Sequence, residues 1–187
     1  EEQYAPLREG YRALLSQLFS LAGLDDNAAT VYAVEEALAA HHWDRVKVRD
    51  ANARYNLLTK EQVLEKLPLL RYWLDGIGAT EAQSQELVLW QPDYVEALGE
   101  LLTDKFSLEE WKSWARANVL RSFAPYLSQD FVDANFAFYG KQLSGTEELR
   151  DRYKRGVELI NGALGEDVAQ LYVAQHFPAG HKAAMDE

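Results

Sequence analysis

Apolar side chains recur at the spacing of an α-helix along most of the chain, and this pattern restricts the fold more than any other feature. Over residues 4–22, one helix face carries Leu7, Tyr11, Leu14, Leu15, Leu18 and Leu21. Gly23 follows as a natural C-terminal stop. A second helix is expected to start at Asp25 or Asp26 and to continue toward Tyr55, long enough to form a spine.

Helix-start signals occur at three further places in the sequence. Thr59 with Gln62, and Ser107 with Glu110, have the spacing of a capping box, in which a hydroxyl and a long side chain satisfy free backbone donors reciprocally. Pro92 stands where a first-turn proline would open another helix. Each signal predicts a helix that begins at that position.

Strand signals are rare. Residues 86–90 form the only short run with strand character, and residues 147–160 and 166–175 have the periodicity of two closing helices. No repeat or low-complexity linker divides the chain. The prediction is a mainly α, multi-helix fold with at most a very short β element. We expect one helical domain over residues 1–187, with residues 171–187 as a possible connector to a further domain.

The charge balance excludes several classes of partner. Nineteen basic and thirty acidic residues give a net charge of −11, which repels nucleic acid and anionic lipid. The apolar runs are far shorter than the roughly 20 residues of a membrane span, and no secretory leader opens the sequence. We therefore expect a soluble segment with no nucleic-acid partner and no membrane contact. Cysteine is absent, which leaves the compartment open between cytoplasmic and exported.

The four histidines are the first place to look for a metal site. His41 and His42 are adjacent, so on a helix their side chains point about 100° apart. His176 and His181 are separated by a stretch that contains Pro178. Neither pair has the spacing of a zinc site, and the H-E-x-x-H motif is missing. We expect no metal ligand and no catalytic residue in this chain.

Charged clusters are interpreted mainly as solvated helix surface. Glu35 and Glu36 precede the histidine pair and could form a carboxylate site, but a solvated helix face explains them equally well. Basic residues 150–155 are interleaved with acidic ones, which favours intrahelical salt bridges over an anion site. A charged helix end is the interpretation of the polar cluster Arg49, Asp50, Arg54, Tyr55 and Asn56.

Aromatic residues are dense in the middle of the chain. Their series could stack nucleic-acid bases or form a peptide-facing wall, but no basic groove accompanies it, so a core role is favoured. The series comprises Trp111, Trp114, Phe123, Tyr126, Phe131, Phe136 and Phe138. We expect burial of Trp43, Trp73, Trp111, Trp114 and the phenylalanines of residues 131–138. Gly140 and Gly145 are interpreted as a turn.

Five segments, taken in order, resemble the N-terminal region of the neprilysin and endothelin-converting-enzyme family of zinc metallopeptidases. They are similar to R-D-x-x-x-x-Y-N, Q-P-x-Y, F-x-F-Y-G-x-x-L-x-G, R-W-K-R with tyrosine in place of tryptophan, and G-x-x-x-x-x-L-Y-V-x-x-x-F followed by lysine. The positions carried over as structural family positions are Arg49, Asp50, Tyr55, Asn56, Pro92, Tyr94, Phe136, Phe138, Gly140, Gly145, Arg152, Lys154, Arg155, Gly165, Tyr172, Phe177 and Lys182.

The resemblance implies that the catalytic equipment lies outside this segment. Full-length relatives carry H-E-x-x-H, a downstream glutamate as third zinc ligand and a substrate clamp, none of which occurs here. The chain is then a fragment, inactive alone, of a zinc metalloendopeptidase of bacterial type. In such relatives this part is a helical domain that covers a chamber, encloses peptide substrates with the catalytic domain and limits substrate size.

A different class of function remains open beside the peptidase. The chain could be a stand-alone helical module that binds a peptide or protein without catalysis. The closing stretch of residues 171–185 is expected either to meet the missing catalytic domain or to pack on the earlier helices. Circular dichroism, metal analysis and the length of the reading frame separate these expectations.

Overall fold

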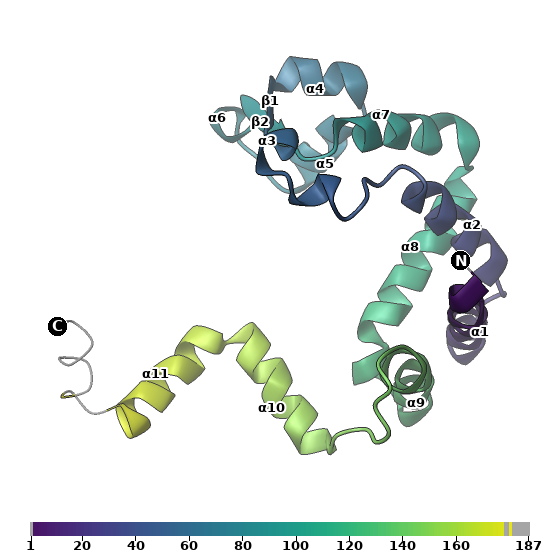
Figure 1. Ribbon diagram of the computed structural model, residues 1–187, viewed down its shortest axis with the longest axis vertical. Coiled ribbons are helices and arrows are strands. Elements are labelled where there is room, and N and C mark those ends of the chain that lie inside the picture. Colours follow the sequence, from purple (N-terminus) through teal and green to yellow (C-terminus); the bar gives the residue numbers. More distant parts are fainter. Residues whose placement is uncertain (1, 178–179, 181–187) are drawn as a thin grey trace. The chain divides into compact units, whose positions relative to one another are not determined.

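The structure is a computed structural model that describes residues 2–177 and 180 (Figure 1). The chain forms two compact units, residues 1–143 and residues 144–187. Helices dominate the described part of the chain, and the one sheet found there has two short strands. The predicted fold class, mainly α with a very short β element, is confirmed.

The first unit contains α1 (Ala5–Leu21), α2 (Ala28–Ala39), α3 (Ala51–Arg54), α4 (Lys60–Lys66), α5 (Leu70–Gly76), α6 (Glu81–Ser84), α7 (Pro92–Glu100), α8 (Leu108–Phe123) and α9 (Gln129–Asn135). Its strands are β1 (Asn56–Thr59) and β2 (Glu86–Leu89). Short 3-10 turns are η1 (Glu2–Tyr4), η2 (Lys47–Arg49) and η4 (Ala124–Tyr126), and the π-helical segments are η3 (Leu101–Lys105) and η5 (Phe136–Leu143). The second unit contains α10 (Arg152–Ala163) and α11 (Gly165–His176).

The first helix agrees closely with its prediction. Gly23 adopts φ 67°, the left-handed conformation that ends many helices, and its N–H donates to the Ser20 carbonyl at 3.0 Å. The Leu24 N–H donates to the Phe19 carbonyl at 3.0 Å, which completes the C-terminal cap. Leu14, Leu15 and Leu18 are buried on the face that the periodicity marked, and Phe19, which was not predicted on that face, is buried as well.

The prediction of a long second helix that continues toward Tyr55 is wrong. It ends at Ala39, and the chain to Tyr55 is broken into η2 and α3. Tertiary contacts explain the break: the Trp43 N–H donates to the Gln91 side chain at 2.8 Å, and the His42 ring stacks on Tyr94 with centroids 4.4 Å apart. A continuous helix could not make these contacts.

Both predicted capping boxes are present. The Thr59 hydroxyl accepts from the Gln62 N–H, and the Ser107 hydroxyl accepts from the Glu110 N–H, with the reciprocal side-chain bond in each case. Thr80 starts α6 in the same way. Pro92 occupies the first turn of α7, as predicted.

The sheet is an antiparallel ribbon of β1 and β2. Asn56 pairs with Leu89, and Thr59 pairs with Glu86. The strand signal of residues 86–90 is therefore confirmed, whereas β1 was not predicted. Its N-L-L-T sequence has little β-branched character, and its position near the end of an apparent helix concealed it.

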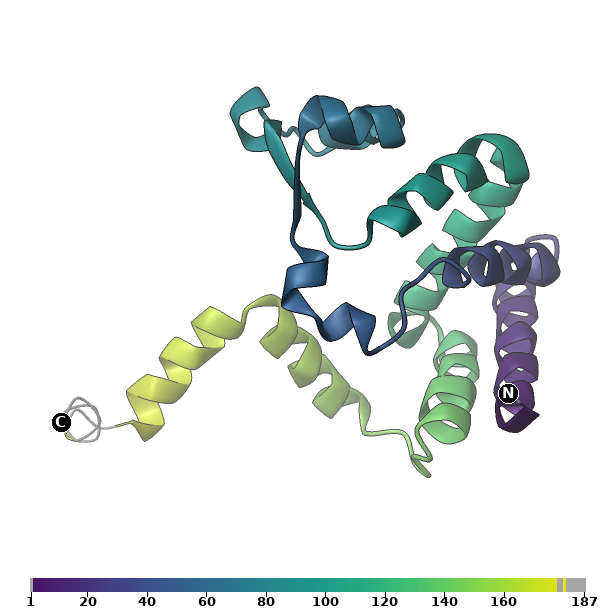
Figure 2. The same ribbon diagram turned by 45° about the horizontal axis from the view of Figure 1, so that its top comes forward.

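The core of the first unit lies where α1 packs against α2, α8, α9 and η5 (Figures 1 and 2). One buried cluster joins Leu14 and Leu18 to Phe138. A second joins Leu15 and Phe19 of the same helix to Val31 and other buried residues. Thus α1 contributes to both clusters and is the central element of this core.

A polar network crosses the same helices. The Nη1 atom of Arg121 donates to the Tyr11 hydroxyl at 2.6 Å and lies 3.4 Å from a Glu35 carboxylate oxygen. The other terminal nitrogen, Nη2, donates to Asn118 Oδ1 at 2.6 Å. Burial raises the pKa of Tyr11 and of Tyr139, although the positive charge of Arg121 acts to lower both. Arg121 therefore connects α8 to α1 and α2 within the core.

The expectation of aromatic burial is wrong in part. Phe138 is buried, and Trp43, Trp111, Trp114, Phe131 and Phe136 are half-buried. Trp73 is 60% exposed, and Phe123 and Tyr126 of the predicted core series are 56% and 57% exposed. Helical spacing places residues on a face but does not say whether another element covers that face.

The second unit has no buried residue in either of its helices. Its α10 begins at Arg152 rather than at residue 147, whereas α11 agrees with the predicted closing helix to within a residue at each end. Leu171 is 73% exposed and Tyr172 is 62% exposed. The apolar side chains of these helices therefore lie largely in solvent in this chain.

Candidate functional site

The motif residues at 49–56 cap and fasten the start of the ribbon. The Asp50 carboxylate accepts from the N–H groups of Asn52 and Ala53 at 2.9 and 3.2 Å, so it is the N-cap of α3 rather than a helix end. The Asn56 side-chain amide donates to the Ala53 carbonyl at 2.7 Å and across the ribbon to the Leu89 carbonyl at 3.0 Å. Arg49 and Tyr55 are exposed beside these contacts.

The second motif, at the start of α7, holds the segment that follows α2. Asp93 accepts from the Trp43 indole at 3.0 Å and pairs with Lys47 at 3.3 Å, and these two contacts lower the pKa of its carboxyl group. Tyr94 stacks on His42, and burial raises the pKa of its hydroxyl. The structure thus brings motif residues from positions 50–56 and 92–94 to one part of the first unit.

The third motif lies in η5 and faces α1. Phe138 contacts Tyr11 and Tyr139, with ring centroids 5.6 and 5.0 Å apart. Gly140 lies inside this π-helical segment, so the predicted turn is wrong at this position, whereas a turn is present at Ser144 and Gly145 adopts φ 68°. A Cβ at Gly140 would overlap the ring of Phe136, and this close approach explains why glycine stands there.

The remaining motif positions belong to the second unit. Gly145 precedes α10, Arg152 is its first residue and Gly165 is the first residue of α11. Lys154 pairs with the N-cap residue Asp151 at 3.1 Å, and Arg150 pairs with Glu158; the basic residues thus pair with acidic ones as predicted, but Arg150 and Asp151 precede α10, so the pairs are not intrahelical. Arg155 donates to the Arg150 carbonyl. Tyr172 lies against His176, Phe177 caps α11, and Lys182 lies outside the described residues.

One face of the ribbon is apolar and exposed. The facing pair Leu57 and Val88 is 44% and 40% exposed. Tyr55 and Trp90, which flank the strands at one end, are 64% and 61% exposed. Sequence reasoning missed this surface because β1 was not predicted; pairing the two runs would have shown the alternation.

Arg54 lies at the same end of the ribbon as Trp90. Its guanidinium carbon is 4.7 Å from the centre of the Trp90 ring, a cation–π distance. Its Nε is buried and has no hydrogen-bond partner among the described residues. The cluster therefore combines exposed apolar side chains with a guanidinium whose buried Nε has no acceptor among the described residues.

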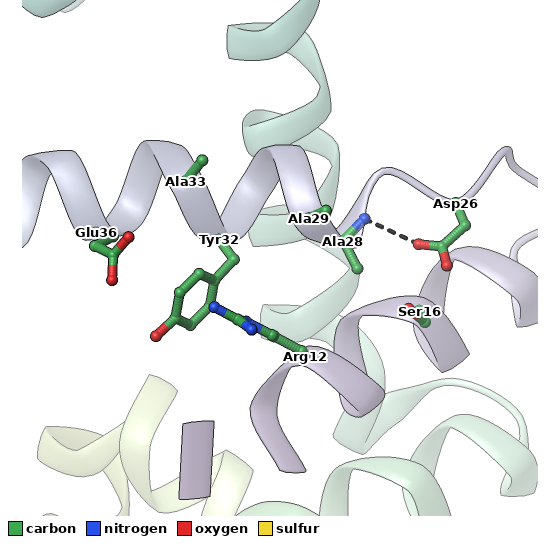
Figure 3. Close-up of a pocket in the computed structure, with 8 residues that line it drawn as sticks. All are labelled: Arg12, Ser16, Asp26, Ala28, Ala29, Tyr32, Ala33 and Glu36. Atoms are coloured by element: carbon green, nitrogen blue, oxygen red, sulfur yellow. Dashed lines mark hydrogen bonds between the residues drawn. The ribbon is translucent and has the colours of Figure 1, made fainter. Parts of the chain in front are cut away.

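A pocket of about 450 Å³ lies between α1 and α2 (Figure 3). Arg12 lies over the Tyr32 ring at 3.8 Å from its centroid, and Glu36 stands near the same ring. Asp26 accepts from the Ala28 N–H at 2.9 Å, so its carboxylate caps α2. The pocket is shallow and its cation is already stacked on an aromatic ring, and no catalytic arrangement lines it.

The described residues do not fit a zinc ion. Within residues 2–177 and at 180, no group of three or more histidine, cysteine, aspartate or glutamate side chains could hold a metal. His41, Glu100 and Asp104 line one pocket together, yet they do not converge on a common point. Among the helices that the structure describes, none has both the length and the apolar character needed to cross a membrane.

Comparisons with known proteins identify the class of this chain. A helical unit with a small ribbon and the five ordered motifs is the N-terminal region of a neprilysin-like metallopeptidase. The model of the N-terminal part of peptidase family M13 matches residues 1–187, and the chain belongs to this family.

Relatives share both sequence and fold. The chain is 30% identical over 176 residues to neutral endopeptidase of Lactobacillus helveticus, a match that covers 90% of this chain and 26% of the relative. It is 29% identical to neprilysin-2 of Drosophila melanogaster, covering 80% of this chain and 21% of the relative. The open state of zinc metalloprotease Zmp1 from Mycobacterium tuberculosis matches with a TM-score of 0.92 and 36% identity, covering all of this chain and 30% of Zmp1.

Proposed function

We propose that this chain is the non-catalytic helical domain of a zinc-dependent metalloendopeptidase that hydrolyses peptides. In this proposal the domain covers the active-site chamber and limits the size of substrates that enter. The observation that carries the proposal is the M13 family match over residues 1–187 in a chain whose described residues hold no zinc ligand set. The zinc ligands and the catalytic base would lie in the remainder of the parent protein.

The share of each relative that is matched supports this division. The chain spans about a quarter of the length of the curated relatives and 30% of Zmp1. Most of each relative therefore has no counterpart here. A rigid helical cover contributes by excluding bulky substrates and positioning peptides, which needs no titratable group from this segment.

The second unit supplies a candidate surface for the remainder of the parent. Helices α10 and α11 bury none of their residues, and Leu171, Tyr172 and Val173 are 73%, 62% and 49% exposed. Exposed apolar surface of this kind marks an interaction site. In the proposal, residues 171–187 connect to the catalytic domain, and the family-motif positions outside this stretch keep the helical domain in shape.

Size selection tests the proposed role. Co-expression of this chain with the downstream part of its gene should give an enzyme that cleaves a short fluorogenic peptide. The same cleavable segment, placed in a loop of a folded carrier of about 30 kDa, should be cleaved at least a hundredfold more slowly. Equal rates on the free peptide and on the folded carrier would contradict a cover that limits substrate size.

A surface variant tests the docking role of the second unit. Tyr172→Ser should weaken reassembly with the downstream part, while the unfolding transition of the chain alone stays unchanged because this side chain is exposed. Tyr126→Ser is the matched control in the first unit and should leave reassembly unchanged, since Tyr126 is 57% exposed. A loss of stability without a loss of reassembly would assign Tyr172 to the fold of the chain instead.

A further inference from the structure

The outer face of the β1–β2 ribbon has the composition of a binding surface. Leu57 and Val88 face each other across the two strands and are both exposed. Tyr55 precedes β1 and Trp90 follows β2, so the same alternation continues to this pair. Four exposed apolar side chains therefore form one strip along a two-stranded ribbon.

The two ends of this strip carry opposite charges. Arg54 stacks on Trp90 at one end, and Glu86 lies in the last strand pair, opposite Thr59, at the other. Five cations of the first unit pair with carboxylates, namely Lys47, Lys60, Lys66, Lys112 and Arg121. Within the described residues the side chain of Arg54 has its contact with Trp90 but no hydrogen bond or ion pair, although the chain carries an excess of acidic groups.

The width of the strip favours an extended ligand. Adjacent strands lie roughly 5 Å apart, which is the width of one extended chain, whereas a helix with its side chains is about 10–12 Å across. Each strand pairs only with the other in the described structure, so the outer edge of each strand is open to a further extended segment. The Nε of Arg54 is buried, so the two terminal nitrogens are the donors left for a ligand, and they suit a carboxylate because two parallel N–H···O bonds form at once.

We propose that this face binds an extended peptide in which an apolar side chain packs on Leu57, Val88 and Trp90 while a neighbouring acidic side chain pairs with Arg54. The strip has no wall beyond Arg54, since Tyr55 and Trp90 are both more than half exposed, so the peptide chain continues past the cation. The carboxylate is therefore that of an internal aspartate or glutamate. The inference rests on the proposed function only in taking peptide as the class of ligand.

Peptide affinity of the 187-residue chain tests this site. The probe is a fluorescent peptide with blocked ends and a central Phe-Glu-Leu sequence between glycine and serine residues, and its partner has glutamine in place of glutamate. Fluorescence anisotropy gives both dissociation constants. The glutamate peptide should bind about tenfold more tightly than the glutamine peptide, the difference expected for a charge-assisted hydrogen bond.

Variants assign that preference to named residues. Arg54→Gln should remove the tenfold preference for glutamate, and Trp90→Ala should weaken both peptides about equally. Arg71→Gln is the matched control, because Arg71 also stacks on an exposed ring, that of Tyr72 at 4.6 Å, away from the ribbon. An unchanged preference in Arg54→Gln, or an equal loss in Arg71→Gln, would overturn the proposal.

The tryptophan indole signals locate the peptide independently of the variants. In a two-dimensional ¹⁵N spectrum the Trp90 indole signal should shift on titration, while that of Trp73, 60% exposed on α5, should stay in place. Shifts at Trp73 without Trp90 would place the peptide elsewhere and refute the site. If the blocked probe fails to bind while the same peptide with a free C-terminal carboxylate binds, the site for an internal acidic side chain is refuted as well.

The outcome for the site is separable from that for the parent enzyme. If the reassembled parent cleaves peptides but Arg54→Gln leaves the glutamate preference of this chain intact, the site fails and the proposed function stands. If the chain binds as expected but the parent lacks peptidase activity, the proposed function fails and the site stands. Loss of reassembly in Trp90→Ala without loss of peptide binding would make this face a domain interface and would overturn the proposal.

Discussion

Replacement of Arg121 by methionine probes the polar network inside the helical core. Methionine keeps most of the apolar stem and removes the guanidinium, so packing changes little while the polar contacts are lost. Those contacts are the hydrogen bonds to Tyr11 and Asn118, both 2.6 Å long, and the ion pair with Glu35. The variant leaves the Tyr11 hydroxyl and the Glu35 carboxylate without their cation.

The magnitude follows from the burial of the pair. The side chains of Arg121 and Glu35 are 30% and 24% exposed, so water replaces part of what is lost. A hydrogen bond to a charged group contributes roughly 1.5–3 kcal/mol, and the 3.4 Å ion pair adds little beyond this because exposed pairs are weak. We expect Arg121→Met to lower the free energy of unfolding by about 2 kcal/mol.

Urea unfolding followed by circular dichroism measures this loss. With a slope of about 2 kcal/mol/M, the midpoint should fall by about 1 M while the slope itself is unchanged. Arg116→Met is the matched control, since Arg116 is an exposed arginine of the same helix and should shift stability by less than about 0.5 kcal/mol. Equal midpoints for the two variants would refute the argument that Arg121 ties α8 to α1 and α2.

Three further outcomes are expected of the helical unit. Ser107→Ala should cost about 1 kcal/mol by urea unfolding because α8 loses its capping hydroxyl, whereas Ser122→Ala, at an exposed position late in that helix, should cost little. Burial raises the pKa of Tyr11 and Tyr139 above the unfolded value of about 10. The contribution of the two neutral hydroxyls to the free energy of unfolding is therefore complete below that pH and is lost as pH rises beyond it. The urea midpoint should therefore be lower at pH 11 than at pH 8, and a higher midpoint at pH 11 would contradict this argument. Gly140→Ala should lower the thermal midpoint, at a cost of about 1–3 kcal/mol, because its Cβ meets the Phe136 ring; an unchanged midpoint would show that the ring moves away freely.

Local signals in the sequence predicted the helix ends well. The glycine stop after α1, both capping boxes and the first-turn proline of α7 act through backbone donors a few residues away. Information of that kind is contained in the local sequence. It sufficed for the fold class and for most helix starts.

Contacts between distant segments decided what the sequence left open. The second helix stops because Trp43 bonds to Gln91 and Asp93, which are far away along the chain. The exposure of Trp73 depends on the absence of a covering element in the described structure, which its own helix does not encode. The ribbon face of Leu57 and Val88 requires the strand register, so no motif in either strand alone indicates it.

The role of the motif positions remains a prediction of the family resemblance. The structure places Asp50 and Asn56 in contacts that fasten α3 to the ribbon, and it places Phe138 in the core. These placements agree with a structural role but do not test it. Asp50→Ala and Asn56→Ala test it together: stability should fall in the isolated chain, without an effect on catalysis beyond that loss in the parent.

Zinc content and peptidase activity of the dialysed chain test the central claim most directly. The 187-residue chain should hold no stoichiometric zinc by elemental analysis and should leave a fluorogenic peptide uncut, whereas the parent protein should hold one zinc per chain and cleave the peptide until a chelator is added. One tightly held zinc in this chain, lost when His41 and His42 are replaced by alanine, would contradict the account. Cleavage of the peptide by the chain alone would contradict it equally.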